Sequence, residues 1–363
     1  MIKRREFIEA VGLTALALPL TSVLGQQAVC AANDRTRIKI GQVGTKHAHA
    51  GGKIATMRKF SELFEVVGVV EPDAKRRAEM EKHPAYRGLK WMNEKELLAT
   101  EGLQAVAVET EVSQLVPTAA RCVAAGMHIH LDKPAGASLA PFKTVLDDAT
   151  RQSKVVQMGY MFRYNPAFQF LFKALKDGWL GNVFEVHAVI SKTVGDASRR
   201  KLSGFSGGSM FELGCHVIDA VVTVLGKPQK VTSFNRRTQP DKDDLADNCL
   251  AVFEYEKATA TVRSALVEVD GGRRRQFVVC GNHGTIDIKP LEPPRLQLTL
   301  DRNRGKFKRG TQEVELPRLG GRYDGDFLDL AKIIHGEKKT DFPPSHDLAV
   351  QKSVLRASGM PVD

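Results

Sequence analysis

Two kinds of hydrophobic pattern alternate along the first half of the chain. Short apolar runs rich in β-branched residues predict strands at 38–43, 64–70, 105–110, 128–131 and 155–161. Stretches with apolar residues three and four positions apart predict helices near 51–60, 74–82, 94–99, 116–125 and 139–152. Strands that alternate with helices form a parallel sheet covered on both faces, so this half predicts a doubly wound α/β domain of the Rossmann type.

The pattern changes in the second half, where strands follow one another with only short turns between them. After a helix at 166–176, a strand at 183–190 and a helix around His216, the apolar alternation predicts strands at 229–235, 248–255, 259–269, 276–280 and 284–288. Short turns join antiparallel strands, so a large and mostly antiparallel sheet is expected. Two last helices, at 324–335 and 345–358, are expected to pack back on the first domain.

These patterns divide the chain into four parts. A signal segment is expected at 1–34, a dinucleotide-binding Rossmann domain at 35–155, an α+β domain for substrate binding and oligomerisation at 156–342, and a C-terminal helix at 343–363. The length of 363 residues suits two domains that each bury a core.

The first 34 residues predict export. The motif Arg4-Arg5-Glu6-Phe7-Ile8 precedes an uncharged apolar stretch at 11–24, which Pro19 interrupts and which is too short to span a membrane. Two adjacent arginines followed by Phe and an aliphatic residue are typical of a twin-arginine signal, and small residues at 28–32 offer a cleavage site. We expect an exported protein of the periplasm or cell envelope that meets the membrane only during export; an amphipathic N-terminal helix is the alternative.

Charge and cysteine content add little to this picture. The net charge of +11 comes from scattered basic groups, and no helix-turn-helix, zinc-finger or RNA-binding signature accompanies it, so we expect no nucleic-acid partner. The run at 273–275 leaves an acidic sugar or an anionic envelope polymer open as a ligand. Five cysteines without CxxC spacing do not indicate a compartment.

The turn after the first strand carries a partial dinucleotide fingerprint. With Gly44 as the first glycine, Lys46 occupies the second glycine position and His49 the third, so phosphate contacts would use side chains as well as backbone amides. Glu71 follows the second strand, where a carboxylate accepts ribose hydroxyls and repels a 2′-phosphate. The cofactor is therefore NAD or NADP, with NAD favoured; the alternative is that Glu71 only opens a helix. The candidate contacts are Gly44, Thr45, Lys46, His47, His49, Glu71 and Thr110.

The H-x-H spacing of His47 and His49 also suits a metal ion. No third ligand with suitable spacing follows in the sequence, so we predict no metal site and favour contact with cofactor or substrate.

Three motifs further along carry a family resemblance. They are Asp132-Lys133-Pro134 at the end of a strand, Arg163-Tyr164-Asn165-Pro166 at the start of the second domain, and Glu212-Leu-Gly-Cys-His216-Val-Ile-Asp219 after a glycine-rich opening. Together they resemble the glucose-fructose oxidoreductase, inositol dehydrogenase and MocA family, in which Glu-Lys-Pro ends this strand. Asp132 replaces that Glu, and the resemblance spans the chain after residue 35.

The resemblance implies a set of roles. His216 would act as general base or acid on a substrate hydroxyl, Lys133 would polarise the same oxygen, and Glu212 would stand where an Asp usually orients the pair. On a helix Glu212, His216 and Asp219 share one face, although Glu212 and Asp219 could equally be salt-bridge partners. Lys133 would also contact the cofactor. The remaining candidates are Asp132 and Arg163 for the cofactor, and Tyr164 and Asn165 beside His216 for the substrate.

The resemblance and the signal together imply an oxidoreductase for a sugar or polyol hydroxyl. No free NAD is available outside the cytoplasm, so a tightly bound cofactor would be recycled by oxidising one substrate and reducing another. One alternative is redox-neutral glycoside cleavage through a keto intermediate, with Tyr164, His47 or Glu212 as a further base; another is a non-catalytic carbohydrate-binding protein. A homodimer or homotetramer is expected.

Overall fold

The protein is described here by a computed structural model that covers residues 36–204, 206–318 and 320–362. The predicted signal at 1–34 lies outside the described residues. Within the described part, no helix is both long enough and apolar enough to cross a bilayer.

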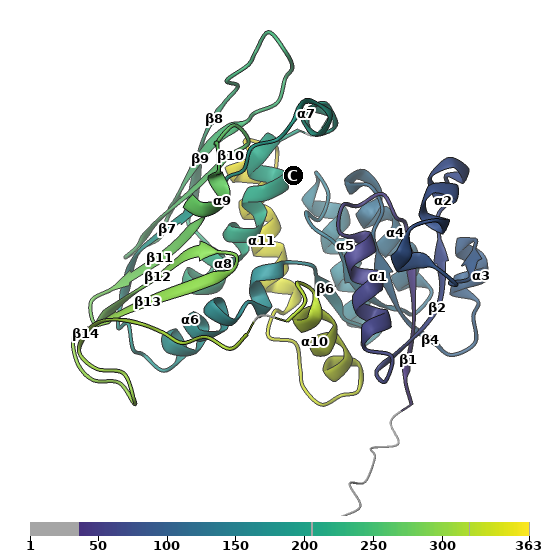
Figure 1. Ribbon diagram of the computed structural model, residues 1–363, viewed down its shortest axis with the longest axis horizontal. Coiled ribbons are helices and arrows are strands. Elements are labelled where there is room, and N and C mark those ends of the chain that lie inside the picture. The colour runs from purple at the N-terminus through teal and green to yellow at the C-terminus, as the bar shows by residue number, and fades with distance from the viewer. Residues whose placement is uncertain (1–35, 205, 319, 363) are drawn as a thin grey trace, which may run out of the picture. The chain divides into compact units, whose positions relative to one another are not determined.

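A six-stranded sheet forms the first part of the fold, and its strands are all parallel (Figure 1). Its order is β3-β2-β1-β4-β5-β6, with β1 at Ile38–Val43, β2 at Phe64–Val70, β3 at Trp91–Met92, β4 at Leu103–Val108, β5 at His128–Leu131 and β6 at Val156–Met158. This order confirms the predicted Rossmann sheet. Two details differ from the prediction: β3 is too short to show a pattern, and β6 pairs with β5, so the sheet continues past residue 155.

Helices connect these strands. They are α1 at Ala50–Lys59, α2 at Ala74–Glu81, α3 at Glu94–Leu98, α4 at Val112–Ala124 and α5 at Leu139–Arg151, with a 3-10 turn at Pro84–Tyr86. In a parallel sheet every strand ends at the same edge, so the residues that follow β1, β2, β4 and β5 meet there. That edge holds the predicted cofactor residues.

An eight-stranded sheet forms the second part, in the order β14-β13-β12-β11-β7-β10-β9-β8. Its strands are β7 at Val183–Val189, β8 at Lys230–Arg236, β9 at Asn248–Glu254, β10 at Thr259–Ala265, β11 at Gln276–Gly281, β12 at Gly284–Leu291, β13 at Pro294–Leu300 and β14 at Gly310–Glu313. Every pairing is antiparallel except that of β7 with β10, which confirms the predicted mostly antiparallel sheet. The sequence analysis missed β13 and β14.

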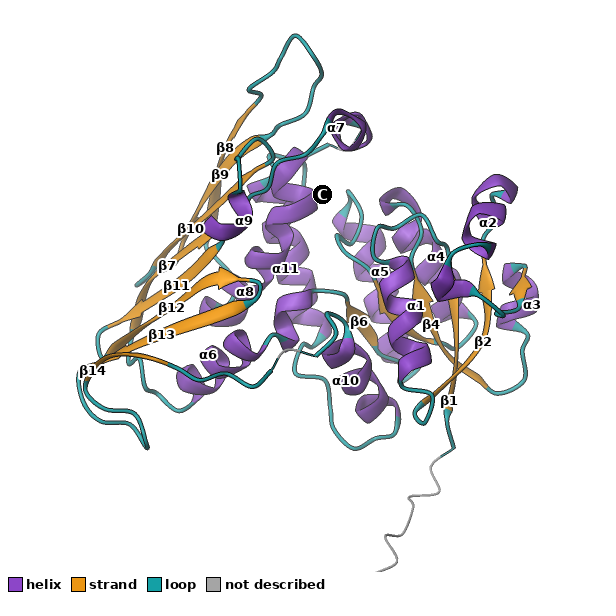
Figure 2. Ribbon diagram, in the orientation of Figure 1, coloured by secondary structure: helices purple, strands orange, loops and turns teal. Residues whose placement is uncertain are grey.

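Three helices, α6 (Pro166–Lys176), α8 (Cys215–Leu225) and α11 (Pro344–Ala357), lie on one face of this sheet in Figure 2. Shorter elements complete it: α7 at Asp196–Ser203, α9 at Gly271–Arg274, a 3-10 turn at Met161–Tyr164 and a π-helical turn at Met210–Gly214. Helix α11 packs against α8 and β8 as well as against α5, so it joins both parts rather than only the first.

Helix α10 (Asp324–Ile334) returns to the first part, as predicted. Its side chains Phe327 and Leu330 are fully buried in a core that also contains Ile38 and Ile40. The Phe327 ring meets the Phe64 ring edge to face, with centroids 5.9 Å apart. Helix α10 therefore completes the hydrophobic core that contains the side chains of β1.

Replacing Phe327 by Ala should test this packing. We expect the free energy of unfolding to fall by about 3–5 kcal/mol, because a fully buried aromatic ring is lost and a cavity remains. The matched change Leu328→Ala, at a neighbouring exposed position of α10, should cost at most about 0.5 kcal/mol. Urea denaturation measures both, and equal small losses would show that α10 does not hold this core together.

Candidate active site

The turn between β1 and α1 is tied to the ends of two neighbouring strands. Gly44 has a φ of +87°, and a Cβ at this position would lie 2.7 Å from Thr110 Cα, so only glycine fits. Thr45 donates from its amide and its hydroxyl to Glu71 Oε2, at 3.0 and 2.7 Å. Glu71 Oε1 accepts from the amide of Asp73 at 3.1 Å. The predicted cofactor residues thus meet where β1, β2 and β4 end.

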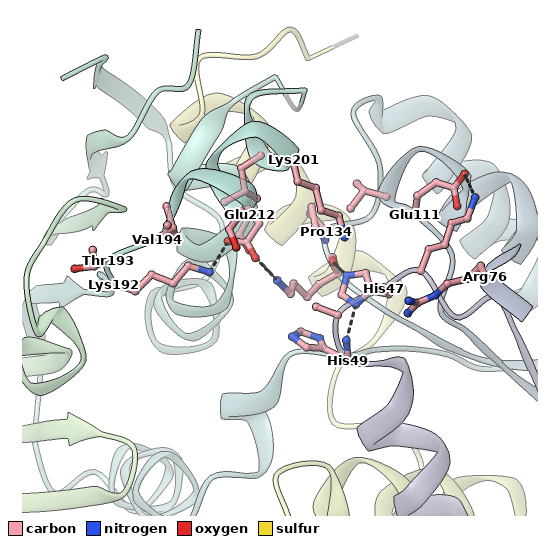
Figure 3. Close-up of a pocket in the computed structure, with 17 residues that line it drawn as sticks. His47, His49, Arg76, Glu111, Pro134, Lys192, Thr193, Val194, Lys201 and Glu212 are labelled. Atoms are coloured by element: carbon pink, nitrogen blue, oxygen red, sulfur yellow. Dashed lines mark hydrogen bonds and ion pairs between the residues drawn. The ribbon is translucent and has the colours of Figure 1, made fainter. Parts of the chain in front are cut away.

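Two cavities meet at this turn. One, of about 510 Å³, is lined by Gly44, Glu71 and Thr110, and the other, of about 660 Å³, contains His49, Lys133 and Glu212. Lys46 lines both cavities. Figure 3 shows the second cavity, with His47 and His49 on one side and Glu212 and Lys192 on the other.

The pair of cavities fits a dinucleotide. Such a cofactor needs a pocket for its adenosine half, a pocket for its nicotinamide half and a positive charge for the pyrophosphate between them. Lys46 supplies that charge, with its Nζ 3.3 Å from Asp73 Oδ2 and 3.9 Å from Glu111 Oε1. The side-chain hydrogen bond to Asp73 raises the pKa of Lys46, so the ammonium stays charged.

A buried ion cluster lies beneath the turn. Lys53 Nζ lies 2.8 Å from Asp132 Oδ2 and 3.2 Å from Glu109 Oε1, and none of these three side chains is exposed. Burial alone would lower the pKa of Lys53, but Asp132 and Glu109 raise it well above its usual value. For Asp132, burial is outweighed by His47, Lys53 and His49, which hold its pKa well below the usual range. Asp132 is therefore an ionised, internal carboxylate.

Both histidines of the H-x-H motif turn toward Asp132. The Nδ1 atom of His47 lies 3.0 Å from Asp132 Oδ2, and that of His49 lies 3.1 Å from it. His47 Nε2 lies 3.1 Å from the carbonyl oxygen of Lys133. Burial lowers the pKa of His49 to about 4, so its ring is neutral near pH 7.

This geometry corrects one expectation from the sequence. We expected no third ligand near His47 and His49, yet Asp132 lies within reach of both. Asp132 follows β5, so no spacing along the chain could reveal it. Lys53 lies beside Asp132 as a counter-charge, and hydrogen bonds join His49 to Asp132.

Lys133 and Glu212 meet across the second cavity. Lys133 Nζ donates to the Glu212 carbonyl oxygen at 2.8 Å and lies 3.8 Å from Glu212 Oε1, while Lys192 Nζ lies 3.4 Å from Glu212 Oε2. Burial would raise the pKa of Glu212, but the two lysines lower it. Glu212 sits on the π-helical turn before α8, and such turns are frequent at functional sites.

His216 lies behind the residues that line the second cavity, with only 2% of its surface exposed. Its ring centroid is 6.4 Å from that of His49 and 5.9 Å from that of Phe162. Its buried Nδ1 has no hydrogen-bond partner among the described residues. Burial, followed by the charge of Lys133, holds the pKa of His216 well below its ordinary value, so this ring is also neutral.

Arg163 differs from the prediction, and Asp219 follows the alternative of a salt-bridge partner. Arg163 donates from Nη2 to Asp219 Oδ1 at 2.6 Å and to Asp347 at 2.5 Å, and these three side chains are almost fully buried. His346 Nε2 lies 3.2 Å from Asp219 Oδ1. Helix α8 is buried on every side from Cys215 to Val222, so sharing a face with His216 does not bring Asp219 to the cavity. Arg163 and Asp219 form an internal ion cluster instead.

Tyr164 and Asn165 do not line the Lys133 cavity, and both line a separate small cavity of about 150 Å³. The Tyr164 hydroxyl donates to Asp329 Oδ2 at 2.8 Å and accepts from Gln157 Nε2 at 3.0 Å. The Asn165 side chain accepts from the amide of Ala167 and caps α6. Both were predicted substrate contacts, and the structure places them elsewhere.

Three residues that the sequence analysis missed belong to the site. Lys53 stands in a helix whose apolar pattern gave no reason to bury a lysine, and Lys192 lies in a loop without a motif. Tyr323, whose ring centroid is 5.7 Å from that of His49, comes from the C-terminal segment. The only sequence feature that pointed to one of these residues was the position of Lys53 among the inward-facing residues of α1.

Comparisons with known proteins agree with this geometry. Residues 38–160 match the model of an oxidoreductase family with an NAD-binding Rossmann fold, and residues 168–287 match the GFO/IDH/MocA C-terminal domain. A trans-1,2-dihydrobenzene-1,2-diol dehydrogenase of Sus scrofa is 26% identical over 151 residues, which are 41% of this chain and 45% of that protein. The chain thus spans about half the length of the curated relatives it matches.

Two solved structures share the fold over most of both chains. An aldose-aldose oxidoreductase from Caulobacter crescentus has a TM-score of 0.72 at 19% identity, covering 89% of this chain and 98% of that one. A levoglucosan dehydrogenase in complex with NADH and levoglucosan has a TM-score of 0.76 at 15% identity, covering 89% and 96%.

Replacing Arg163 by Met separates a structural role from cofactor binding. We expect the free energy of unfolding to fall by about 3–5 kcal/mol, because two buried carboxylates lose their cation. Dinucleotide affinity of the folded variant should stay within about twofold of the parent, because distant sites act independently. Urea denaturation and calorimetric titration test this; unchanged stability with a large loss of affinity would restore Arg163 as a cofactor contact.

Proposed function

The chain belongs to the Gfo/Idh/MocA oxidoreductase family, and we propose that it is an NAD(P)-dependent oxidoreductase acting on a hydroxyl of a sugar, polyol or related carbohydrate. One observation carries the proposal: the buried ammonium of Lys133 reaches a cavity that adjoins the dinucleotide turn at Lys46. A cation fixed at that place stabilises negative charge as it develops on a substrate oxygen. A bound nicotinamide accepts or returns the hydride.

The contacts of Lys133 fix its ammonium group at the cavity before substrate binds. Its Nζ is anchored by the carbonyl oxygen of Glu212, and its amide donates to Asp132 Oδ1 at 2.7 Å. Burial would lower the pKa of Lys133, but nearby Cys215, Glu212 and Asp132 raise it. The ammonium therefore keeps its charge and its place without substrate, which is what electrostatic stabilisation requires.

We propose NAD as the preferred form of the cofactor. Glu71 faces the turn with a buried carboxylate, which would repel a 2′-phosphate. The nearby arginines are already engaged: Arg76 donates to the carbonyl oxygen of Thr45 at 2.7 Å, and Arg77 pairs with Glu81 at 2.9 Å.

We also propose that the cofactor stays bound and is recycled within the protein. The support is the twin-arginine motif at Arg4-Arg5, because exported proteins meet no pool of free NAD. The solved aldose-aldose oxidoreductase bears a name that pairs two sugars, which fits a closed cycle. Redox-neutral glycoside cleavage is a second candidate, with Glu212 at the wall of the Lys133 cavity as the further base.

A homodimer or homotetramer is proposed on the basis of the second sheet. Phe184 on β7 and Phe234 on β8 are each about half exposed. A second copy could cover them.

The first experiment is to denature the purified protein and analyse the supernatant for dinucleotide by mass spectrometry. We expect stoichiometric NAD, and about 10- to 100-fold weaker binding in Lys46→Ala, because one charge-assisted contact to the pyrophosphate is lost. Lys82→Ala, an exposed lysine at the end of α2, is the matched control and should bind normally. No dinucleotide, with no binding of added NAD or NADP, would favour a non-catalytic carbohydrate-binding protein.

Export is tested by changing Arg4 and Arg5 to Lys in the full chain. In a bacterium with a twin-arginine system, the parent should reach the periplasm, whereas the double variant should remain in the cytoplasm as the longer precursor. Cell fractionation and immunoblotting follow both forms. Equal export of the two would refute the signal.

A further inference from the structure

His49 and Asp132 form a pair that resembles the base and orienting carboxylate of many hydrolases. The Asp132 carboxylate lies 3.1 and 3.2 Å from His49 Nδ1 through its two oxygens. Asp132 is fixed in turn by Lys53 and by the amide of Lys133, at 2.8 and 2.7 Å. A base held by a second, buried group is the arrangement that activates a histidine.

The pairing decides which nitrogen of His49 is available. An ionised carboxylate only accepts hydrogen bonds, so the proton of the neutral ring lies on Nδ1 and the lone pair on Nε2. Nε2 has no hydrogen-bond partner among the described residues, and 17% of the His49 side chain is exposed at the wall of the cavity. His49 therefore offers a free basic nitrogen to the space beside Lys133.

The other two histidines of this region lack one of these features. His47 places both ring nitrogens near acceptors, Asp132 Oδ2 and the carbonyl oxygen of Lys133, so it has no free basic nitrogen. His216 is 2% exposed, and among the described residues no hydrogen bond joins its ring to a carboxylate, because Glu212 faces Lys133 and Lys192 instead. An imidazolium at position 216 would be buried, and both burial and the charge of Lys133 oppose it.

We propose that His49, oriented by Asp132, accepts the proton of the substrate hydroxyl. This rests on the proposed oxidoreductase function. The O–H bond breaks, its proton goes to His49 Nε2, and its electron pair forms the second bond of the carbonyl. The C–H bond breaks at the same carbon, and its electron pair leaves with hydrogen as hydride to nicotinamide. In the reverse reaction, His49 returns the proton to the oxygen, and the hydride returns to the carbon.

The charges around His49 suit this role. Asp132 stabilises the imidazolium once it forms, while Lys133 stabilises the alkoxide as the proton leaves. The other titratable groups that face the ring are His47 on the same turn, His216 on α8 and Tyr323 before α10. Burial raises the pKa of Tyr323 to about 12, so this neighbour stays neutral and does not compete as a base.

The tautomer of His49 gives a test that needs no substrate. In protein labelled with ¹⁵N histidine, long-range proton–nitrogen spectra separate the Nδ1–H from the Nε2–H form, and His49→Asn assigns the signal. We expect His49 to be neutral at pH 7 with its proton on Nδ1. A ring protonated on Nε2, or on both nitrogens, would overturn the proposal.

Single-turnover reduction of the bound cofactor gives the second test, with myo-inositol, D-glucose and D-glucuronate as probes. His49→Asn should slow the reduction of the bound cofactor at least about 100-fold, as expected for loss of a general base. Imidazole should restore part of the rate to His49→Gly. His335→Asn, at the far end of α10 from Tyr323, is the control and should react normally.

The outcomes distinguish a wrong assignment of the base from a wrong assignment of the oxidoreductase function. If the parent reduces its cofactor but His49→Asn reacts at the parental rate, His49 is not the base and the oxidoreductase stands. If the parent reduces no cofactor with any probe, the proposed function fails, and the tautomer measurement alone decides whether the pair is built as described.

Discussion

The buried ammonium of Lys53 is the constraint on which the site depends. It joins Asp132 and Glu109, which follow β5 and β4, to helix α1, and it keeps two internal carboxylates from repelling each other. Burial, and after it the charge of Asp132, raises the pKa of Glu109 well above its usual value, so the charge of Lys53 does not offset both at Glu109. At Asp132, His47 and Lys53 together outweigh burial and favour the ionised carboxylate, which gives the histidines of the turn a fixed partner.

The turn after β1 shows what this cluster makes possible. Common dinucleotide turns use small residues so that the backbone approaches the pyrophosphate. Here only Gly44 keeps that role, while Lys46 and His49 occupy the positions of the other two. The side chains of Lys46 and His49, which replace glycine, both have partners in the protein. Lys46 faces the junction of the two cavities, and His49 turns inward to Asp132, so the turn brings both charge and a base to the site.

The sequence predicted the fold well because the apolar periods of the two halves differ. It also proposed Lys133, Glu212 and the turn at Gly44 as site residues, since each lies in a motif or at the end of a strand, and the structure places them around two adjoining cavities. It failed for Arg163, which pairs with Asp219 in the interior. For Asp219 it left a salt-bridge role open, and the helix is buried on all sides, so it has no single functional face. It failed for Lys53 and Tyr323, since their partners lie on other elements and no spacing along one strand or helix connects them. The local pattern of apolar and polar residues cannot predict which charged residues from different elements will meet.

Cofactor binding and catalysis share one scaffold in this protein. The turn donates from Thr45 to Glu71 after β2, packs Gly44 on Thr110 after β4, and places His47 Nε2 against the carbonyl of Lys133 after β5. Each of these contacts joins the loop that would hold the pyrophosphate to a strand end that carries a substrate or cofactor residue. A dinucleotide that orders the turn would therefore also fix the ring of His49 and the backbone of Lys133. Because packed strand ends deform little, the positions of His49 and Lys133 relative to the cofactor loop are set before any substrate arrives.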